Sequence, residues 1–193
     1  MKIAASEIGF DFDGVIADTA GAFLRLACEE YEYCAFTLED VTRFEVSECL
    51  TIPDQYISAI LKDLNEDCLG VGLEPMPGAV EVLSAIARDM PRQNRVRIIT
   101  ARYLSEPVAA WLAHHFPADV LAMIHLTAMG EHDDKLRHIR EYGLKFFVDD
   151  RAETCLGLAE AGISPLVFSQ PWNRRRHSLP TVTSWREIES LLL

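Results

Sequence analysis

The fold class can be inferred from one stretch near the N-terminus, Ile8-Gly9-Phe10-Asp11-Phe12-Asp13-Gly14-Val15. Residues 8–12 predict a short buried strand. The stretch also contains two acids separated by one residue, Asp11 and Asp13, and Gly14 follows them. In an open parallel α/β sheet, ligands bind beyond the carboxyl ends of the strands. Because an unpaired buried carboxylate is costly, acids at that position favour a functional site, with solvated loop acids as the alternative. We therefore expect the first strand to carry Asp11 and Asp13 into such a site.

Strands and helices alternate along the rest of the chain. Apolar runs predict further strands over 96–100, 122–127, 145–149 and 165–168. Helical patterns occupy 78–89, 106–116, 132–142, 152–161 and 184–192, and Gly143 and Gly162 follow two of these helices, where a helix stop is expected. This alternation predicts an α/β fold with a Rossmann-like, mostly parallel sheet and helices on both faces.

The segment 18–75 breaks the alternation. It has no strand pattern, but it predicts helices over 19–33 and 53–67, and a capping box at Thr37-Leu38-Glu39-Asp40 predicts a short one between them. We therefore expect a core formed by residues 1–17 and 76–193, with a small helical insertion at 18–75.

Charge narrows the classes of partner. The 193 residues include 18 Lys and Arg against 30 Asp and Glu, for a formal net charge of −12. This balance argues against a nucleic-acid polymer or an anionic membrane surface as partner. The longest apolar run, 108–113, is far shorter than the ~20 residues of a membrane span. Because no apolar stretch of signal-peptide length occurs near Met1 either, we expect a cytoplasmic location.

The cysteines predict no special chemistry. They number five, an odd count, and no Cys-x-x-Cys pair suggests a zinc site or a redox motif. We expect them to be small buried apolar side chains, which also fits the cytoplasmic expectation.

A second pair of acids, Asp149-Asp150, follows the predicted strand at 145–149. If both acid-bearing strands are central, four carboxylates converge, and their mutual repulsion requires a cation. Oxygen ligands of this kind suit Mg²⁺. Thr100 ends another strand and Lys135 lies in the helix before 145. A hydroxyl and an ammonium beside acids and a cation are what a phosphoryl group requires.

These residues resemble, in order, the four motifs of the haloacid dehalogenase (HAD) superfamily. Receiver domains of response regulators share the residue types, but their paired acids come before the Thr and Lys rather than last. The dehalogenase branch lacks a second acid in the first motif. The presence of Asp13 therefore favours hydrolysis of a phosphate ester, with a phosphomutase as an alternative. In this superfamily a helical insertion after the first motif is a cap over the active site, which residues 18–75 fit.

The resemblance implies roles. Asp11 would be the nucleophile that forms an aspartyl-phosphate, and Asp13 the general acid and base, with its backbone carbonyl on Mg²⁺. Thr100 and Lys135 would hold phosphoryl oxygens. Asp11 and Asp150 would also hold the metal, with Asp150 the best match for a direct ligand. Asp149 would be either a second ligand or a residue that orients the first.

A closer resemblance is to the 5′(3′)-deoxyribonucleotidase branch. It rests on residues 11–25, on 73–81, and on Gln170-Pro171-Trp172-Asn173-Arg174 with the later Ser184-Trp185. The sequence Thr100-Ala101-Arg102 departs from the Thr-Ser-Pro of that branch, so Ala101 and Arg102 are candidate substrate contacts of this chain.

The expected substrate is therefore a (deoxy)nucleoside 5′-monophosphate. The alternatives are another small phosphorylated metabolite, such as a sugar phosphate or phosphoglycolate, and a non-catalytic binding protein. Residues 18–75 hold 13 acidic and three basic residues. That acidity favours a monophosphate over a triphosphate.

Overall fold

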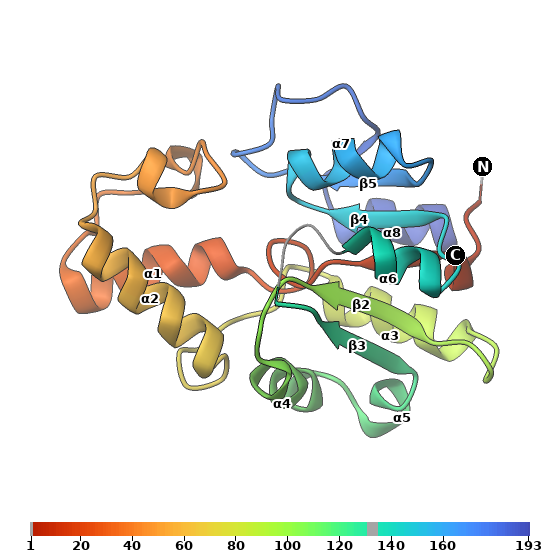
Figure 1. Cartoon of the computed structure of the whole chain (residues 1–193). Coiled ribbons are helices and arrows are strands. Elements are labelled where there is room, and N and C mark those ends of the chain that lie inside the picture. Colours follow the sequence, from red (N-terminus) through yellow and green to blue (C-terminus); the bar gives the residue numbers. More distant parts are fainter. Residues whose placement is uncertain (1, 131–134) are drawn as a thin grey trace.

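The computed structural model describes residues 2–130 and 135–193, and at its centre lies a six-stranded sheet in which all neighbouring strands are parallel (Figure 1). The strand order is β3-β2-β1-β4-β5-β6. The strands are β1 (Ile8–Phe10), β2 (Val96–Thr100), β3 (Ile124–Ala128), β4 (Phe146–Asp149), β5 (Ser164–Phe168) and β6 (Thr181–Val182). The predicted α/β class with a parallel sheet is therefore confirmed.

Helices cover both faces of this sheet. Helices α3 and α8 pack together behind the sheet in Figure 1, and α6 and α7 lie in front of it. Successive side chains of a strand point to opposite faces, so Ile98 belongs to the larger hydrophobic cluster and Ile99 to the smaller one. The helices of this part are α3 (Ala79–Asp89), α4 (Ser105–His115), α5 (Ala118–Leu121), α6 (Lys135–Glu141), α7 (Ala152–Glu160) and α8 (Trp185–Leu192).

Several element boundaries differ from the prediction. Strand β1 ends at Phe10 rather than at residue 12, because the chain turns at Gly14, whose φ is 68°. Strand β3 begins at Ile124 rather than at residue 122, because helix α5 ends at Leu121 and a turn over 122–123 follows it. The sequence does not predict β6, since two residues are too few to show an alternating pattern. The first three residues of the predicted helix 132–142 lie outside the described residues.

The segment between β1 and α3 contains two packed helices, as expected. Helix α1 (Thr19–Tyr31) packs against α2 (Asp54–Glu66), and two short 3₁₀ turns, η2 (Leu38–Asp40) and η3 (Val46–Glu48), lie between them. The chain leaves and re-enters the sheet region side by side, because Asp18 N donates to Glu74 O and Met76 N donates to Ile16 O. This narrow neck supports the proposed division of the chain into a core and residues 18–75.

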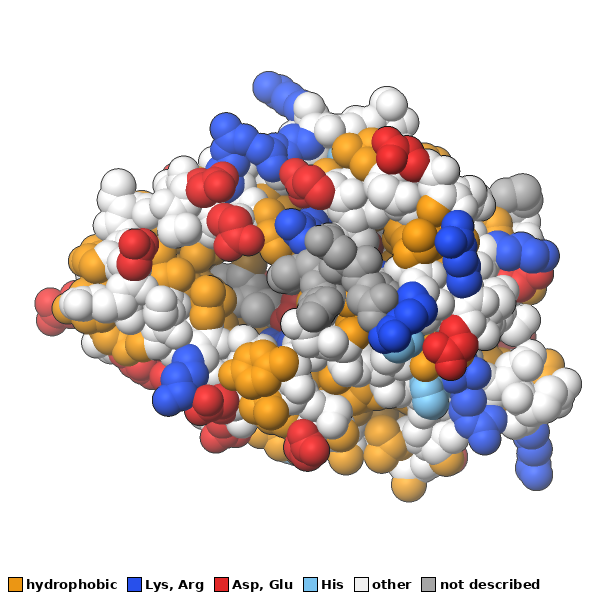
Figure 2. All heavy atoms as spheres, viewed as in Figure 1, with side chains coloured by type: hydrophobic (Ala, Val, Ile, Leu, Met, Phe, Trp, Pro, Cys, Tyr) orange, Lys and Arg blue, Asp and Glu red, His pale blue; other side chains and the backbone are white. Residues whose placement is uncertain are grey.

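The two parts differ in surface charge. On the face shown in Figure 2, Lys and Arg side chains lie mostly over the sheet and its loops, and acidic ones are more frequent over the helical segment. Among the described residues, no helix combines the length and the apolarity needed to cross a membrane.

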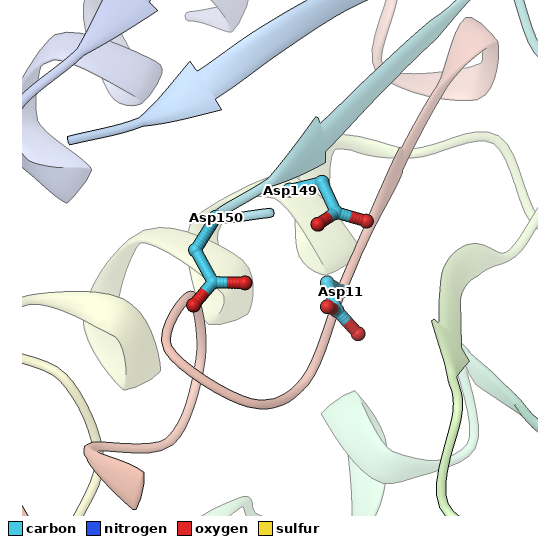
Figure 3. A group of neighbouring side chains, drawn as sticks. All are labelled: Asp11, Asp149 and Asp150. Carbon is cyan, nitrogen blue, oxygen red and sulfur yellow. The ribbon is translucent and has the colours of Figure 1, made fainter. Parts of the chain in front are cut away.

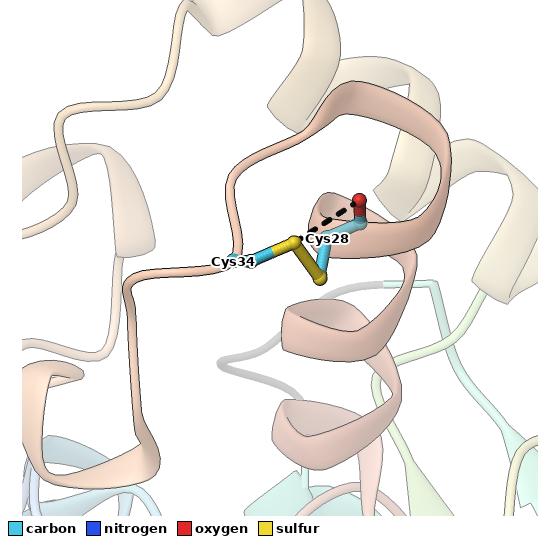
Figure 4. Close-up of a disulfide and its surroundings, with 2 residues drawn as sticks. All are labelled: Cys28 and Cys34. Carbon is cyan, nitrogen blue, oxygen red and sulfur yellow. Dashed lines mark hydrogen bonds between the residues drawn. A yellow bond between two sulfur atoms is a disulfide. The ribbon is translucent and has the colours of Figure 1, made fainter.

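The cysteine prediction is wrong for two of the five residues. Cys28 and Cys34 form a disulfide with a Cα–Cα distance of 4.2 Å (Figure 4), and Cys34 is exposed. The reason is local. Glu32 ends α1 in the left-handed conformation, with a φ of 64°, and turns the chain back toward the last helical turn. The buried thiols of Cys68 and Cys155 and the half-buried Cys49 are free.

Candidate active site

The strand order brings the predicted site residues to one edge of the sheet. Strand β1 lies between β2 and β4, and the chain continues from β1 toward β2 but from β4 toward β5. Connections that leave neighbouring strands in opposite directions open a crevice at the carboxyl ends. Asp11, Thr100 and Asp149 follow or end these three strands, so they meet at that crevice.

Three buried carboxylates form the centre of the site. Oxygen atoms of Asp11, Asp149 and Asp150 lie within 4.8 Å of one another (Figure 3). The Lys135 ammonium lies 2.7 Å from Asp11 Oδ2 and 2.6 Å from Asp149 Oδ2. Three acids against one ammonium leave an excess of buried negative charge, which a cation would neutralise.

The pKa values reflect this excess. Burial raises the pKa of Asp11 to about 7; Lys135 opposes the shift, and Asp149 and Asp13 add to it. Burial and the neighbouring Asp149 and Asp11 raise the pKa of Asp150 well above its ordinary value. Carboxylates in this state are destabilised as anions until positive charge arrives.

The donor set fits a hard divalent cation. The Asp149 carboxylate is already engaged, since it accepts from Lys135 and, at 2.8 Å, from the backbone N–H of Arg151. The Asp150 carboxylate accepts no hydrogen bond from the described residues. Mg²⁺ is usually held by one or two carboxylates together with water and substrate phosphate. Asp11 and Asp150 are therefore the side chains best placed to hold it, and Asp149 is placed to orient Lys135.

Asp13 lies outside this triad and has other partners. Its carboxylate accepts from Arg102 Nη2 at 2.8 Å and Nε at 3.0 Å, and from Thr19 Oγ1 at 2.5 Å. Burial raises the pKa of Asp13, but the charge and hydrogen bonds of Arg102, with the hydroxyl of Thr19, outweigh it and hold the pKa below its ordinary value. In this arrangement Asp13 is a carboxylate.

Arg102, a predicted substrate contact, is held by partners within the protein. It is 6% exposed, and besides Asp13 it contacts the helical segment: Nη1 donates to Leu64 O at 2.5 Å and to Cys68 Sγ at 3.1 Å. Leu64 lies in the last turn of α2, where backbone carbonyls lack helical partners. The departure at Thr100-Ala101-Arg102 indicated an unusual residue here, but sequence alone could not identify its partners.

A cleft of about 410 Å³ opens between the core and the helical segment. Of the predicted site residues, Asp13, Ala101, Arg102 and Asp150 line it, whereas Asp11, Thr100, Lys135 and Asp149 are not among its lining residues. Thr100 is fully buried, and its Oγ1 accepts from the backbone N–H of Arg102 at 3.2 Å. The rest of the wall is mainly apolar and includes Phe23, Val41, Phe44, Leu61, Leu64 and Trp172, with Glu45 and Asn65 as polar members.

Two residues near the site were not predicted to act in it. Gln170 and Asn173 are buried, and their side-chain amides donate to Gly14 O at 2.8 Å and to Asp150 O at 2.7 Å. The only sequence signal was the similarity of 170–174 to tails of the nucleotidase branch, which carried no role.

Comparison with known proteins decides the family. The model of a family described as 5′ nucleotidase, deoxy (pyrimidine), cytosolic type C protein matches residues 5–193. The chain belongs to this family. The match covers the sheet, the helical segment and the tail together, and it confirms the resemblance found in the sequence motifs.

Curated relatives agree with this 5′-nucleotidase assignment. A predicted nucleotidase from Halalkalibacterium halodurans is 26% identical over 94% of this chain and 90% of its own. The mitochondrial 5′(3′)-deoxyribonucleotidase of Mus musculus is 34% identical over 61% of this chain and 56% of its own. The nucleotidase is therefore a phosphatase, and the non-catalytic alternative is set aside.

Solved structures agree on the fold. A HAD family hydrolase from Deinococcus radiodurans superposes with a TM-score of 0.62 at 16% identity, covering 97% of each chain. A predicted phosphoglycolate phosphatase from Lactobacillus delbrueckii gives 0.61 at 14% identity, covering 98% of this chain and 99% of its own. At these identities the likeness concerns the fold alone, which places the nucleotidase in the HAD architecture.

Proposed function

We propose that this nucleotidase is a Mg²⁺-dependent phosphomonoester hydrolase that acts on (deoxy)nucleoside 5′-monophosphates through an aspartyl-phosphate. The observation that carries the proposal is the buried triad of Asp11, Asp149 and Asp150 with Lys135, joined through Asp150 to an apolar cleft. A charged phosphate suits the triad once a cation is bound, and an uncharged, flat nucleoside suits the apolar wall. The pattern of polar groups at one end and apolar groups at the other matches such a substrate.

In this proposal Asp11 is the nucleophile. A bond forms between its carboxylate and phosphorus while the bond from phosphorus to the leaving oxygen breaks, and the leaving oxygen takes a proton from Asp13. Water then attacks phosphorus, gives its proton to Asp13 and releases phosphate and Asp11. Lys135 and Thr100 hold phosphoryl oxygens while charge shifts. Mg²⁺, when held by Asp11, Asp150 and the Asp13 carbonyl, supplies charge neutralisation.

The ion pair between Arg102 and Asp13 affects the step in which Asp13 gives a proton to the leaving oxygen. As a carboxylate, Asp13 is ready to accept a proton from water. To protonate a leaving alcohol it must hold a proton while next to Arg102, so the pair has to loosen when substrate is bound. We further propose that residues 18–75 form the cap and that its side chains Phe23 and Phe44 contact the leaving group, since both line the cleft.

The apolar wall favours a nucleoside over the alternative substrates. Sugar phosphates and phosphoglycolate present hydroxyl and carboxylate groups, and the acidic Glu45 in the wall disfavours a second anion. A triphosphate is disfavoured for the same reason.

A substrate panel tests the proposal. Purified protein with Mg²⁺ should release phosphate fastest from nucleoside monophosphates, and EDTA should abolish the release. The panel should include sugar phosphates, phosphoglycolate and a nucleoside triphosphate at equal concentration. Faster release from a sugar phosphate than from every nucleotide would refute the nucleotide proposal, and full activity in EDTA would refute the metal dependence.

A further inference from the structure

The turn after β5 touches both acid-bearing loops with uncharged side chains. Gln170 and Asn173 are 5% and 1% exposed. Gln170 Nε2 donates to Gly14 O at 2.8 Å, in the loop that follows Asp11 and Asp13. Asn173 Nδ2 donates at 2.7 Å to Asp150 O and at 2.7 Å to Phe168 O. One amide therefore holds each loop, and the Phe168 contact ties the second amide to the end of β5.

The two amides are themselves connected. Asn173 Oδ1 accepts from the backbone N–H of Gln170 at 3.1 Å, so a hydrogen bond closes the turn across its four residues. All the donors and acceptors in this connection are buried, and breaking one would leave a buried polar group without a partner. The turn therefore fixes the position of one acid loop relative to the other.

These loops need such a constraint because their charges repel. Asp11, Asp149 and Asp150 crowd within one small volume, and Lys135 offsets only part of their charge. The loops also approach closely, since a Cβ on Gly14 would lie 2.1 Å from Asp150 Oδ2. A neutral amide can hold backbone carbonyls at this distance without forming an ion pair that would compete with a cation for the carboxylates.

We propose that Gln170 and Asn173 are positioning residues that hold the two acid loops at the separation a divalent cation requires. The inference rests on the proposed metal dependence. Neither amide touches the reacting atoms; both act through the backbone of Gly14 and Asp150. The folded protein holds the carboxylates close together against their mutual repulsion, and a bound cation removes that repulsion. A site held in this way binds the cation more tightly than a site whose loops can move apart.

Cation affinity measured without substrate tests the proposal. Mg²⁺ would be titrated into the wild-type protein, Asn173→Ala and Gln170→Ala by calorimetry at one fixed pH, and the Mg²⁺-induced rise in unfolding temperature would be recorded. Loss of a group that orients ligands typically weakens metal binding by about 10- to 100-fold, which is the change expected for each variant. The rise in unfolding temperature should shrink in parallel.

A matched control separates positioning from packing. Ile188→Ala in α8 removes a fully buried side chain but leaves both amides in place, so it should lower the unfolding temperature without changing Mg²⁺ affinity. If Asn173→Ala does not fold, Gln170→Met, which keeps the length of the side chain but lacks the donor to Gly14, decides by the same titration.

The outcomes are distinct. Variants that bind Mg²⁺ as tightly as the wild type, while unfolding at a lower temperature, would overturn the inference and leave the proposed function standing. A wild-type protein that binds no divalent cation would overturn the proposed metal dependence, and the inference with it.

Discussion

At the scale of single residues, the ion pair with Arg102 sets the charge of Asp13. The guanidinium holds the pKa of Asp13 below its ordinary value against burial. In Arg102→Met the burial remains and the cation is gone, so the pKa of Asp13 should rise. The limb of the pH–rate profile that reports Asp13 should therefore move to higher pH.

A control for Arg102→Met is available next to it. Cys68→Ala removes only the sulfur contact of Arg102 and keeps the pair with Asp13, so its profile should match the wild type. An Arg102→Met profile with both limbs unmoved would show that Arg102 does not set the charge of Asp13.

Asp11→Asn gives the second prediction at this scale. The amide keeps the volume of the side chain but cannot attack phosphorus, so turnover of a nucleoside monophosphate should fall by at least about 10³-fold. The circular dichroism spectrum should be that of the wild type. Retention of most of the activity would contradict the assignment of Asp11 as nucleophile.

At the scale of elements, the turn after β1 requires glycine. Gly14 has a φ of 68°, and an added Cβ would meet Asp150 Oδ2 at 2.1 Å. Gly143 has a similar φ of 67° with nothing within 4 Å of its Cβ position. Gly143→Ala should therefore lower the free energy of unfolding only by the cost of a left-handed backbone, about 1–2 kcal/mol. Gly14→Ala should lower it by more and should also weaken Mg²⁺ binding. Urea unfolding and metal titration of both variants check this, and equal losses would argue against the close approach at Asp150.

The disulfide at the end of α1 is a second element-scale prediction. Closing a short loop should stabilise the chain by about 2 kcal/mol. Cys34→Ser should lose that amount, and a reductant should lower the unfolding midpoint of the wild type but not of Cys34→Ser. Cys49→Ser, which removes a free thiol, should behave as the wild type. If a reductant lowered the unfolding midpoint of Cys34→Ser as much as that of the wild type, the disulfide would not be the source of the stabilisation.

Most secondary-structure elements could be predicted from the sequence, whereas the disulfide and β6 could not. Five strands follow from apolar runs and the main helices from helical periodicity, because these elements bury apolar side chains. The disulfide does not follow, since it depends on the left-handed conformation of Glu32, and the residue type there does not demand that conformation. The two-residue β6 carries no periodic signal either.

In the site, too, some contacts could be predicted from the sequence and others could not. Motif order brings Asp11, Lys135 and Asp149 together correctly, because parallel strand ends meet at one edge. Long-range partners escape prediction: Arg102 reaches α2, and Gln170 lies 156 positions from the carbonyl it holds.

At the scale of the whole molecule, stability in the absence of metal should depend on pH in an unusual direction. The pKa of Asp11 is about 7 in the fold against an ordinary value of 3.8. Between these values the folded protein binds more protons than the unfolded chain, so this group's contribution to stability is present below pH 4 and is lost as pH rises through 7. In EDTA, the free energy of unfolding of the wild type should fall relative to that of Asp11→Asn between pH 5 and 8, and Mg²⁺ should restore more of it at pH 8.

The variant Asp11→Asn serves as the control for that dependence. It removes the titrating group, so the slope in EDTA should flatten and the protein should become more stable at pH 8. A free-energy difference between the wild type and Asp11→Asn that stays constant in EDTA between pH 5 and 8 would contradict the charge excess described at the triad.

The narrow neck between core and helical segment has an evolutionary consequence. The outgoing and returning segments of the chain meet where Ala17 pairs with Pro75. Because the chain enters and leaves residues 18–75 only there, we expect insertions or deletions within them to leave the register of β1 against β2 and β4 unchanged. Selection can therefore vary the part of the cleft wall that residues 18–75 supply while the strands that lead to Asp11, Thr100 and Asp149 keep their pairing. The positions that such variation has to preserve are Thr19, Leu64 and Cys68, because they contact Asp13 or Arg102.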